Sequence, residues 1–204
     1  MKYDISALGN ALVDTQYMVD YEFLESIGLE ADSMTLASAE EQAPIIKKLI
    51  DMGSESVSDC GGSATNSLIA ASNYGSKCHH VCRVSDDADG KKYLESLRSA
   101  GVDHIGVSSK ESDMPTGKCL ILVTPDAKRT MSSMLGVSAF LATSDIKFDV
   151  IDDSKIFYIE GYMVTSEENF GAVISVLEHL EDKNTLKEAI AFKNTKIEIN
   201  ILIG

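Results

Sequence analysis

The stretch "DCGGSATNSLIAASNYG", from Asp59 to Gly75, places two adjacent glycines directly before a helical pattern. Because glycine has no Cβ, Gly61 and Gly62 allow a ligand to approach the backbone closely. The first turn of the following helix leaves backbone N–H groups without helical partners, and such groups bind oxygen atoms. The stretch therefore predicts a site for an oxygen-bearing ligand at the start of this helix.

Outward from this helix, predicted strands and helices alternate along the chain. This alternation predicts an α/β fold with a largely parallel sheet covered by helices. Strands are predicted over residues 3–9, 78–84 and 155–161, and helices over 38–53, 63–75, 87–101 and 166–183.

Two of the predicted helices carry apolar stripes at helical spacing, which identify the faces expected to pack against the sheet. The stripes are Ile45, Ile46, Leu49 and Ile50 in one helix, and Phe170, Val173, Ile174 and Leu177 in the other.

Residues 116–135 interrupt the alternation with two β-prone runs on either side of "PDAK", a turn-forming tetrad. We expect an antiparallel hairpin here and a further short strand within residues 31–38. Such strands can build a small sheet that covers a ligand at the carboxyl edge of the parallel strands. The segments near 15–38 and 115–135 are therefore predicted to form a lid.

Asn66 and Asp14 add polar side chains to the predicted site. Asn66 lies one turn into the helix, and Asp14 follows the first strand in "GNALVD", on an expected loop. A carboxylate accepts from two O–H donors while a carboxamide both donates and accepts, so the pair suits hydroxyl groups. The alternative is that Gly61 and Gly62 only form a tight turn and that Asp14 is a solvated loop residue.

The composition limits the class of partner. Of 204 residues, 44% are hydrophobic, and 32 acidic against 18 basic residues give a formal charge of -14. This charge repels nucleic acid and anionic membrane surfaces, so a small neutral or cationic ligand is expected. No window approaches the roughly 18 apolar residues of a membrane span, and the N-terminus lacks a long apolar run, so we expect a cytoplasmic protein.

Two further motifs are disfavoured by their spacing. In "CHHVC", Cys78, His80 and Cys82 share one face of an extended strand and could converge on a metal. Core packing is favoured, because a structural zinc site normally needs four ligands and no second ligand pair follows. Phosphate-binding loops are excluded, since no G-x-G-x-x-G occurs and "PTGKC" lacks the required flanking residues.

Several motifs follow the order and spacing of the N-terminal half of the PfkB carbohydrate kinases, namely "LGNALVD", "CGGSATNS", "VSDDADG", "PTGKCLILVTPDAKRTM" and "YIEGYMV". The sequence resembles this family over residues 3–182 and is most similar to its adenosine-kinase-like branch. The resemblance implies a ribokinase-like fold, with a mostly parallel sheet flanked by helices and a small β lid. It also implies that a nucleoside or sugar is held by Asn10, Asp14, Gly61, Gly62 and Asn66.

The resemblance further implies transfer of the γ-phosphoryl group of ATP to a primary hydroxyl, with Mg²⁺ and backbone N–H groups stabilising the developing charge. In the family, the proton-accepting carboxylate belongs to a G-A-G-D motif, and an N-x-x-E motif is linked to magnesium. The sequence contains neither motif and no Gly-Asp dipeptide. We therefore expect the acceptor half of a kinase, without the catalytic aspartate, the ATP site or the C-terminal half of the sheet.

Residues 1–188 are expected to form this acceptor-binding part. Residues 189–204 are rich in Lys, Asn and Ile, although a buried strand is expected at this point of the fold. A shifted reading frame or a partial gene would produce such a composition. The alternative is a short paralogue. Two functions stay open: a sugar or nucleoside kinase, inactive as this truncated chain, and a non-catalytic sugar-binding, nucleoside-binding or dimerising module. The open edges of the lid predict a homodimer.

Overall fold

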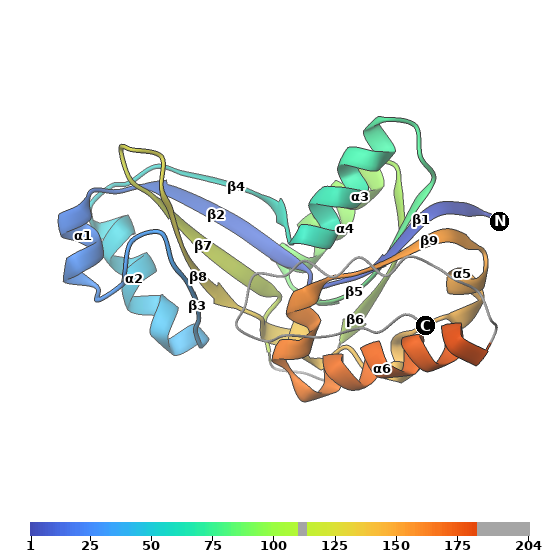
Figure 1. Ribbon diagram of the computed structural model, residues 1–204. Coiled ribbons are helices and arrows are strands. Elements are labelled where there is room, and N and C mark those ends of the chain that lie inside the picture. Colours follow the sequence, from blue (N-terminus) through green and yellow to red (C-terminus); the bar gives the residue numbers. More distant parts are fainter. Residues whose placement is uncertain (110–113, 183–204) are drawn as a thin grey trace.

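The chain folds around two β-sheets, which Figure 1 shows. The computed structural model describes residues 1–109 and 114–182. Within these residues, the first sheet has four parallel strands in the order β6-β5-β1-β9, and the second has five strands in the order β3-β8-β7-β2-β4. The predicted α/β fold, with a parallel main sheet and a second sheet beside it, is confirmed, but within the described residues the second sheet has more strands than the first and is not the small sheet expected.

The first sheet consists of β1 (Tyr3–Leu8), β5 (Cys78–Ser85), β6 (Val102–Ser109) and β9 (Ser154–Ile159). Ile5 of β1 lies opposite Cys78 on one side and Ile156 on the other. Strand β6 was not predicted from the sequence, whereas the other three strands were. Cys78 and Cys82 of β5 pack in the core, which is the interpretation that the apolar pattern favoured.

One face of the first sheet is covered by two helices. These are α3 (Ser63–Asn73) and α4 (Ala88–Ser99), both predicted from the sequence. Leu68 of α3 and Tyr93 and Leu97 of α4 are buried against the strands. The helix that follows the two glycines is therefore anchored on the main sheet.

The other face is covered by helical segments from the last third of the described chain. Figure 1 shows α6 on the side of the sheet away from α3 and α4. Phe157 of β9 packs there with Met163 and Val176. The segments are η1 (Gly136–Phe140), η2 (Thr143–Asp145), α5 (Phe148–Asp152), η3 (Gly161–Thr165) and α6 (Glu167–Asp182), where η denotes a 3-10 helix.

The buried side of α6 differs from the predicted stripe. Phe170 and Ile174 are 45% and 38% exposed, whereas Asn169, Ala172 and Val176 are fully buried. The stripe was misassigned because several adjacent apolar residues fit more than one helical face. The packing of α6 against the sheet decides which face of the helix is buried, and the buried face includes the polar residue Asn169.

The second sheet consists of β2 (Leu12–Met18), β3 (Met34–Leu36), β4 (Ser56–Gly61), β7 (Gly117–Val123) and β8 (Arg129–Met134). Strands β7 and β8 form the predicted antiparallel hairpin, and β3 pairs with β8 as the predicted additional strand. Strand β4 lies outside both segments proposed as the lid. Strands β3 and β4 are the edges of this sheet, and the homodimer through it stays a prediction.

Helices α1 (Tyr21–Ser26) and α2 (Ala39–Asp51) cover one face of the second sheet. Phe23 of α1 and Leu49 of α2 are buried there. Ile50, which the sequence pattern assigned to the buried stripe of α2, is 63% exposed, so that assignment was wrong. Because successive residues of a strand point to opposite faces, every second side chain of this sheet projects away from these helices.

Candidate functional site

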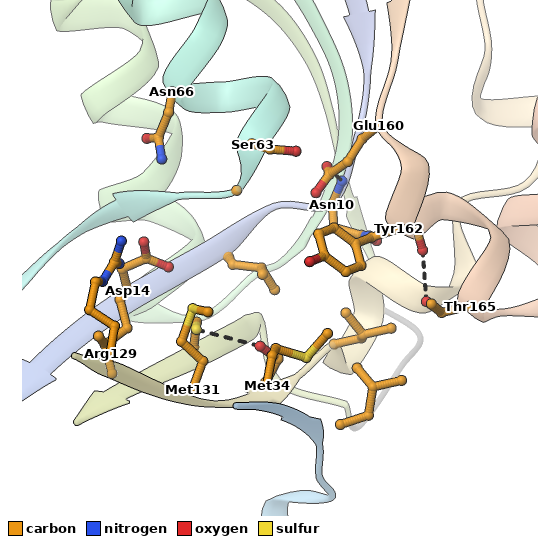
Figure 2. A pocket seen from close by; sticks show the side chains of 17 residues that line it. Asn10, Asp14, Met34, Ser63, Asn66, Arg129, Met131, Glu160, Tyr162 and Thr165 are labelled. Carbon is orange, nitrogen blue, oxygen red and sulfur yellow. Dashed lines mark hydrogen bonds between the residues drawn. The ribbon is translucent and has the colours of Figure 1, made fainter. Parts of the chain in front are cut away.

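A cavity of about 210 Å³ lies where the carboxyl ends of β1 and β9 meet the second sheet. Figure 2 shows the side chains that line it. They come from the turn after β1, from the start of α3, from the residues after β9, and from β2, β3, β7 and β8. The carboxyl edge of a parallel sheet is the usual place for a ligand in α/β proteins.

Four of the five residues predicted from the sequence line this cavity together: Asn10, Asp14, Gly62 and Asn66. In Figure 2, Asn66 extends from α3 towards the part of the cavity where Asp14 lies. Gly61 does not line the cavity itself, but it leaves room for the side chain of Asp14, which does. A Cβ at Gly61 would lie 2.1 Å from the Asp14 carboxyl carbon. The fold thus brings the predicted residues together.

Asp14 lies within strand β2 and not on the loop expected from the sequence. Its register partners are Asp59 of β4 and Cys119 of β7. Burial raises the pKa of Asp14 to about 6; the positive charge of Arg129 opposes this rise, and the negative charge of Asp59 adds to it. Within residues 1–109 and 114–182, no hydrogen bond to the carboxylate contributes to this shift, so its oxygens are available to a ligand.

Gly62 begins α3 with a φ of 100°, in the region that favours glycine. A Cβ at this position would lie 2.5 Å from the backbone oxygen of Asn10. The start of α3 therefore sits directly against the turn after β1. Ser63 and Asn66 in the first turn of α3 line the cavity beside it.

Glu160 follows β9, lines the cavity and is only 2% exposed, but was not predicted from the sequence. Its Oε2 accepts a hydrogen bond from the Asn10 backbone N–H at 2.8 Å. Burial raises the pKa of Glu160 to about 7, and the polar groups of Asn10 and Ser63 offset only part of this rise. Gly9 leaves room for the side chain, since a Cβ there would lie 2.5 Å from Oε2. The sequence did contain a signal for Glu160, because it is the single carboxylate near the end of the apolar run "KIFYIEG".

The opposite wall of the cavity comes from one face of the second sheet. Arg129, Met131 and Ser133 alternate along β8 and all line the cavity. Figure 2 shows Arg129 close to Asp14, in keeping with the effect of its charge on that carboxylate. A sheet covering the ligand was predicted, but not which of its faces forms the wall, because alternation defines two faces of a strand without telling which of them helices cover. The apolar residues of the wall are Leu12, Met34, Leu36, Ile121, Met131 and Leu135.

A family model described as pfkB family carbohydrate kinase matches residues 24–198. The chain belongs to this family. The pfkB chain is 26% identical over 191 residues to adenosine kinase from Saccharomyces cerevisiae, with 90% of this chain and 54% of that relative covered. It is 29% identical over 89 residues to ribokinase from Mus musculus, which covers 43% of this chain and 27% of that relative.

Solved structures share the fold of this pfkB chain. Adenosine kinase from Sinorhizobium meliloti is 27% identical, with a TM-score of 0.80 over 94% of this chain and 56% of that structure. Adenosine kinase from Schistosoma mansoni in complex with adenosine is 19% identical, with a TM-score of 0.77, and supports the fold alone. The chain spans about half the length of these relatives. The predicted family and fold are confirmed, whereas the predicted ligand contacts stay predictions.

No helix in the part of the chain that the structure describes is both long enough and apolar enough to cross a membrane.

Proposed function

We propose that this pfkB chain binds the acceptor of a kinase reaction, namely adenosine or a related sugar or nucleoside whose primary hydroxyl receives the γ-phosphoryl group of ATP. The observation that carries the proposal is the division of the cavity into two sides. Asp14 on β2, Asn66 on α3 and Glu160 after β9 form a polar side, and apolar side chains of the second sheet, such as Met131 and Ile121, form the other side. A nucleoside has the same division, because its ribose carries hydroxyls and its base presents a flat, largely apolar face.

The polar side suits the hydroxyls of a ribose or another sugar. Ionised Asp14 can accept hydrogen bonds from two neighbouring hydroxyls, and Asn66 can both donate and accept. The Gly61–Gly62 backbone allows a ligand oxygen to approach the free N–H groups at the start of α3. These groups would hold the sugar between the start of α3 and strand β2.

The apolar wall suits a nucleobase. Met34 and Met131 supply polarisable sulfur atoms, which make favourable contacts with aromatic rings, and Leu36 and Ile121 extend the apolar surface. The adenosine kinases of S. cerevisiae and S. meliloti, to which the chain is similar, support a nucleoside as the ligand. Adenosine is therefore the first ligand to test.

ATP is the proposed phosphoryl donor because the similar proteins are kinases. Arg129 on the cavity wall offers a guanidinium group, which binds phosphate oxygens well. In the described residues, no group of three or more His, Cys, Asp or Glu side chains could hold a metal ion. The described residues therefore do not fit a Mg²⁺ site.

A non-catalytic binding module is the second candidate function. The observation that favours it is the cavity itself, since a sugar or nucleoside could bind there without any phosphoryl transfer. Both candidates require acceptor binding. They differ in whether the bound acceptor can be phosphorylated once a catalytic aspartate is supplied.

Titration calorimetry with adenosine, ribose and fructose tests the proposal. We expect adenosine to bind, and we expect no adenosine-dependent ADP release when ATP and Mg²⁺ are added to the chain alone. Failure of all three ligands to bind would contradict the proposed function. A chimera with the remaining part of the S. meliloti adenosine kinase separates the two candidates: turnover supports a kinase, and binding without turnover supports a binding module.

Gly61→Ala is expected to weaken adenosine binding by about tenfold, because the new Cβ would overlap the Asp14 carboxyl group and push it aside. The strand conformation of Gly61 accepts alanine, so the chain should still fold. Gly171→Ala on α6 is the matched control, since a Cβ there meets nothing within 4 Å. Unchanged affinity of the Gly61→Ala protein in calorimetry would show that the position of the Asp14 carboxylate does not matter for binding.

A further inference from the structure

Asn169 is a polar residue on the buried face of α6, and it is fully shielded from solvent. Its side chain bonds to groups from two other segments. Its Oδ1 accepts from the Leu141 backbone N–H at 3.0 Å, and its Nδ2 donates to the Ser138 backbone oxygen at 3.1 Å. The same Nδ2 donates to Oδ1 of Asn10 at 3.1 Å, although the two residues are 159 positions apart. Asn169 therefore reaches from outside the cavity to a residue that lines it.

These bonds fix which way the Asn169 amide points. A backbone N–H can only donate, so the atom facing Leu141 must be the side-chain oxygen of Asn169. A backbone carbonyl can only accept, so the atom facing Ser138 must be the side-chain nitrogen. The Asn169 nitrogen is consequently the group that faces Asn10, and it presents a donor to that residue.

A second residue fixes the Asn10 amide in the same sense. Ser138 Oγ accepts from the Ala11 backbone N–H at 2.9 Å, which leaves its own proton to donate to Asn10 Oδ1 at 3.3 Å. Asn10 Oδ1 thus receives two hydrogen bonds. Its Nδ2, by contrast, is buried and has no hydrogen-bond partner within the described residues.

An unpartnered buried amide nitrogen is costly, and a ligand that accepts a hydrogen bond would remove this cost. Asn10 lines the cavity, so its free N–H groups are the ones available to such a ligand. Were the amide turned over, its nitrogen would face the two donors, and its oxygen would be offered to the ligand instead. The orientation of Asn10 therefore decides whether this part of the cavity donates or accepts.

We infer that Asn169 is a positioning residue that holds the Asn10 amide with its N–H₂ group towards the ligand. The inference rests on the proposed function. It gives the cavity a defined polarity, in which Asp14 accepts hydrogen bonds from ligand hydroxyls while Asn10 donates a hydrogen bond to a ligand oxygen or ring nitrogen. A ligand that presents only a donor to Asn10 is disfavoured.

A double-mutant cycle in adenosine affinity tests this role. Asn169→Leu has a similar volume and removes the donor to Asn10, and it is expected to weaken adenosine binding by about tenfold. In an Asn10→Ala background, the same substitution should cause no further loss, because Asn169 acts through Asn10. Ser175→Ala is the matched control, since Ser175 on α6 bonds to Thr143 and should leave the affinity unchanged in both backgrounds.

Equal losses in the two backgrounds, or no loss in either, would overturn the inference, because a purely structural role does not depend on Asn10. Asn169→Asp keeps the acceptor for Leu141 and replaces Asn169→Leu if the latter does not fold. If the wild-type chain bound no acceptor, the proposed function would fail, but the orientation of the Asn10 amide could still be tested.

NMR of the ligand-free protein tests that orientation. A through-hydrogen-bond correlation from the Asn169 side-chain nitrogen to the side-chain carbonyl carbon of Asn10 supports the inference. A correlation from the Asn10 side-chain nitrogen to the side-chain carbonyl carbon of Asn169 overturns it.

Discussion

Asp14→Asn is expected to weaken adenosine binding by about 10- to 100-fold, because hydrogen bonds to a charged acceptor contribute about 1.5–3 kcal/mol. The substitution keeps the shape of the side chain and removes its charge. Since the pKa of Asp14 is raised to about 6, the ionised form is lost below that pH. Wild-type protein should therefore bind adenosine more tightly at pH 8 than at pH 5, and the variant should lose most of this dependence.

Titration calorimetry at the two pH values measures this effect, with thermal unfolding as the check on folding. Asp149→Asn is the matched control, because Asp149 is an exposed aspartate on α5 that does not line the cavity. Any pH dependence left in the Asp14→Asn protein would be assigned to Glu160, whose pKa is about 7. A variant that binds as tightly as wild type and melts at the same temperature would mean that Asp14 is not a ligand contact.

Glu160→Gln is expected to stabilise the ligand-free protein at pH 8. Burial raises the pKa of Glu160 from 4.5 to about 7, so the folded state binds this proton more tightly than the unfolded state. The resulting stability is fully present below about pH 4.5 and is lost as the pH rises through 7. At about 1.4 kcal/mol for each pK unit, the loss at pH 8 is about 3 kcal/mol. Glutamine avoids this cost because it carries no charge.

Urea unfolding and thermal melts at pH 8 and pH 5 would measure the difference. The variant should melt about 6–10 °C above wild type at pH 8, as expected for a chain of this size, and the gap should shrink towards zero at pH 5. Its side-chain oxygen can still accept the bond from the Asn10 N–H. Glu178→Gln, at an exposed position on α6, is the control. A gap of the same size at both pH values would show that the charge of Glu160 is not what destabilises the fold.

Local sequence patterns predicted much of the main sheet and most of the longer helices. The alternation of strand and helix patterns was sufficient to predict β1, β5, β9 and the long helices that cover them, because apolar periodicity can be recognised within each segment separately. The "PDAK" turn was sufficient for the hairpin of β7 and β8. The same patterns missed β2, whose apolar residues are interrupted by the polar run from Asp14 to Gln16, and β4, whose residues are largely polar or small.

The local sequence argument for the site is most direct where the residues are close in sequence. Gly61, Gly62 and Asn66 belong to a single strand-to-helix junction, where glycine and the helix start give a direct physical reason for a ligand site. Asp14 was selected as a carboxylate, but on a loop. Its place on β2 depends on pairing with β4 and β7, which no local pattern expresses.

The sequence by itself thus determined the α/β class, the glycine-led helix and the family. The tertiary structure alone decided which residues meet across long separations: the Asn10 backbone N–H with the Glu160 carboxylate, 150 residues apart, and the side chains of Asn10 and Asn169, 159 residues apart. It also decided which face of the second sheet became the apolar wall and which face of α6 was buried. The physical reason is that burial and hydrogen bonding in these places depend on the packing of whole elements against one another, whereas propensity and periodicity describe each element separately.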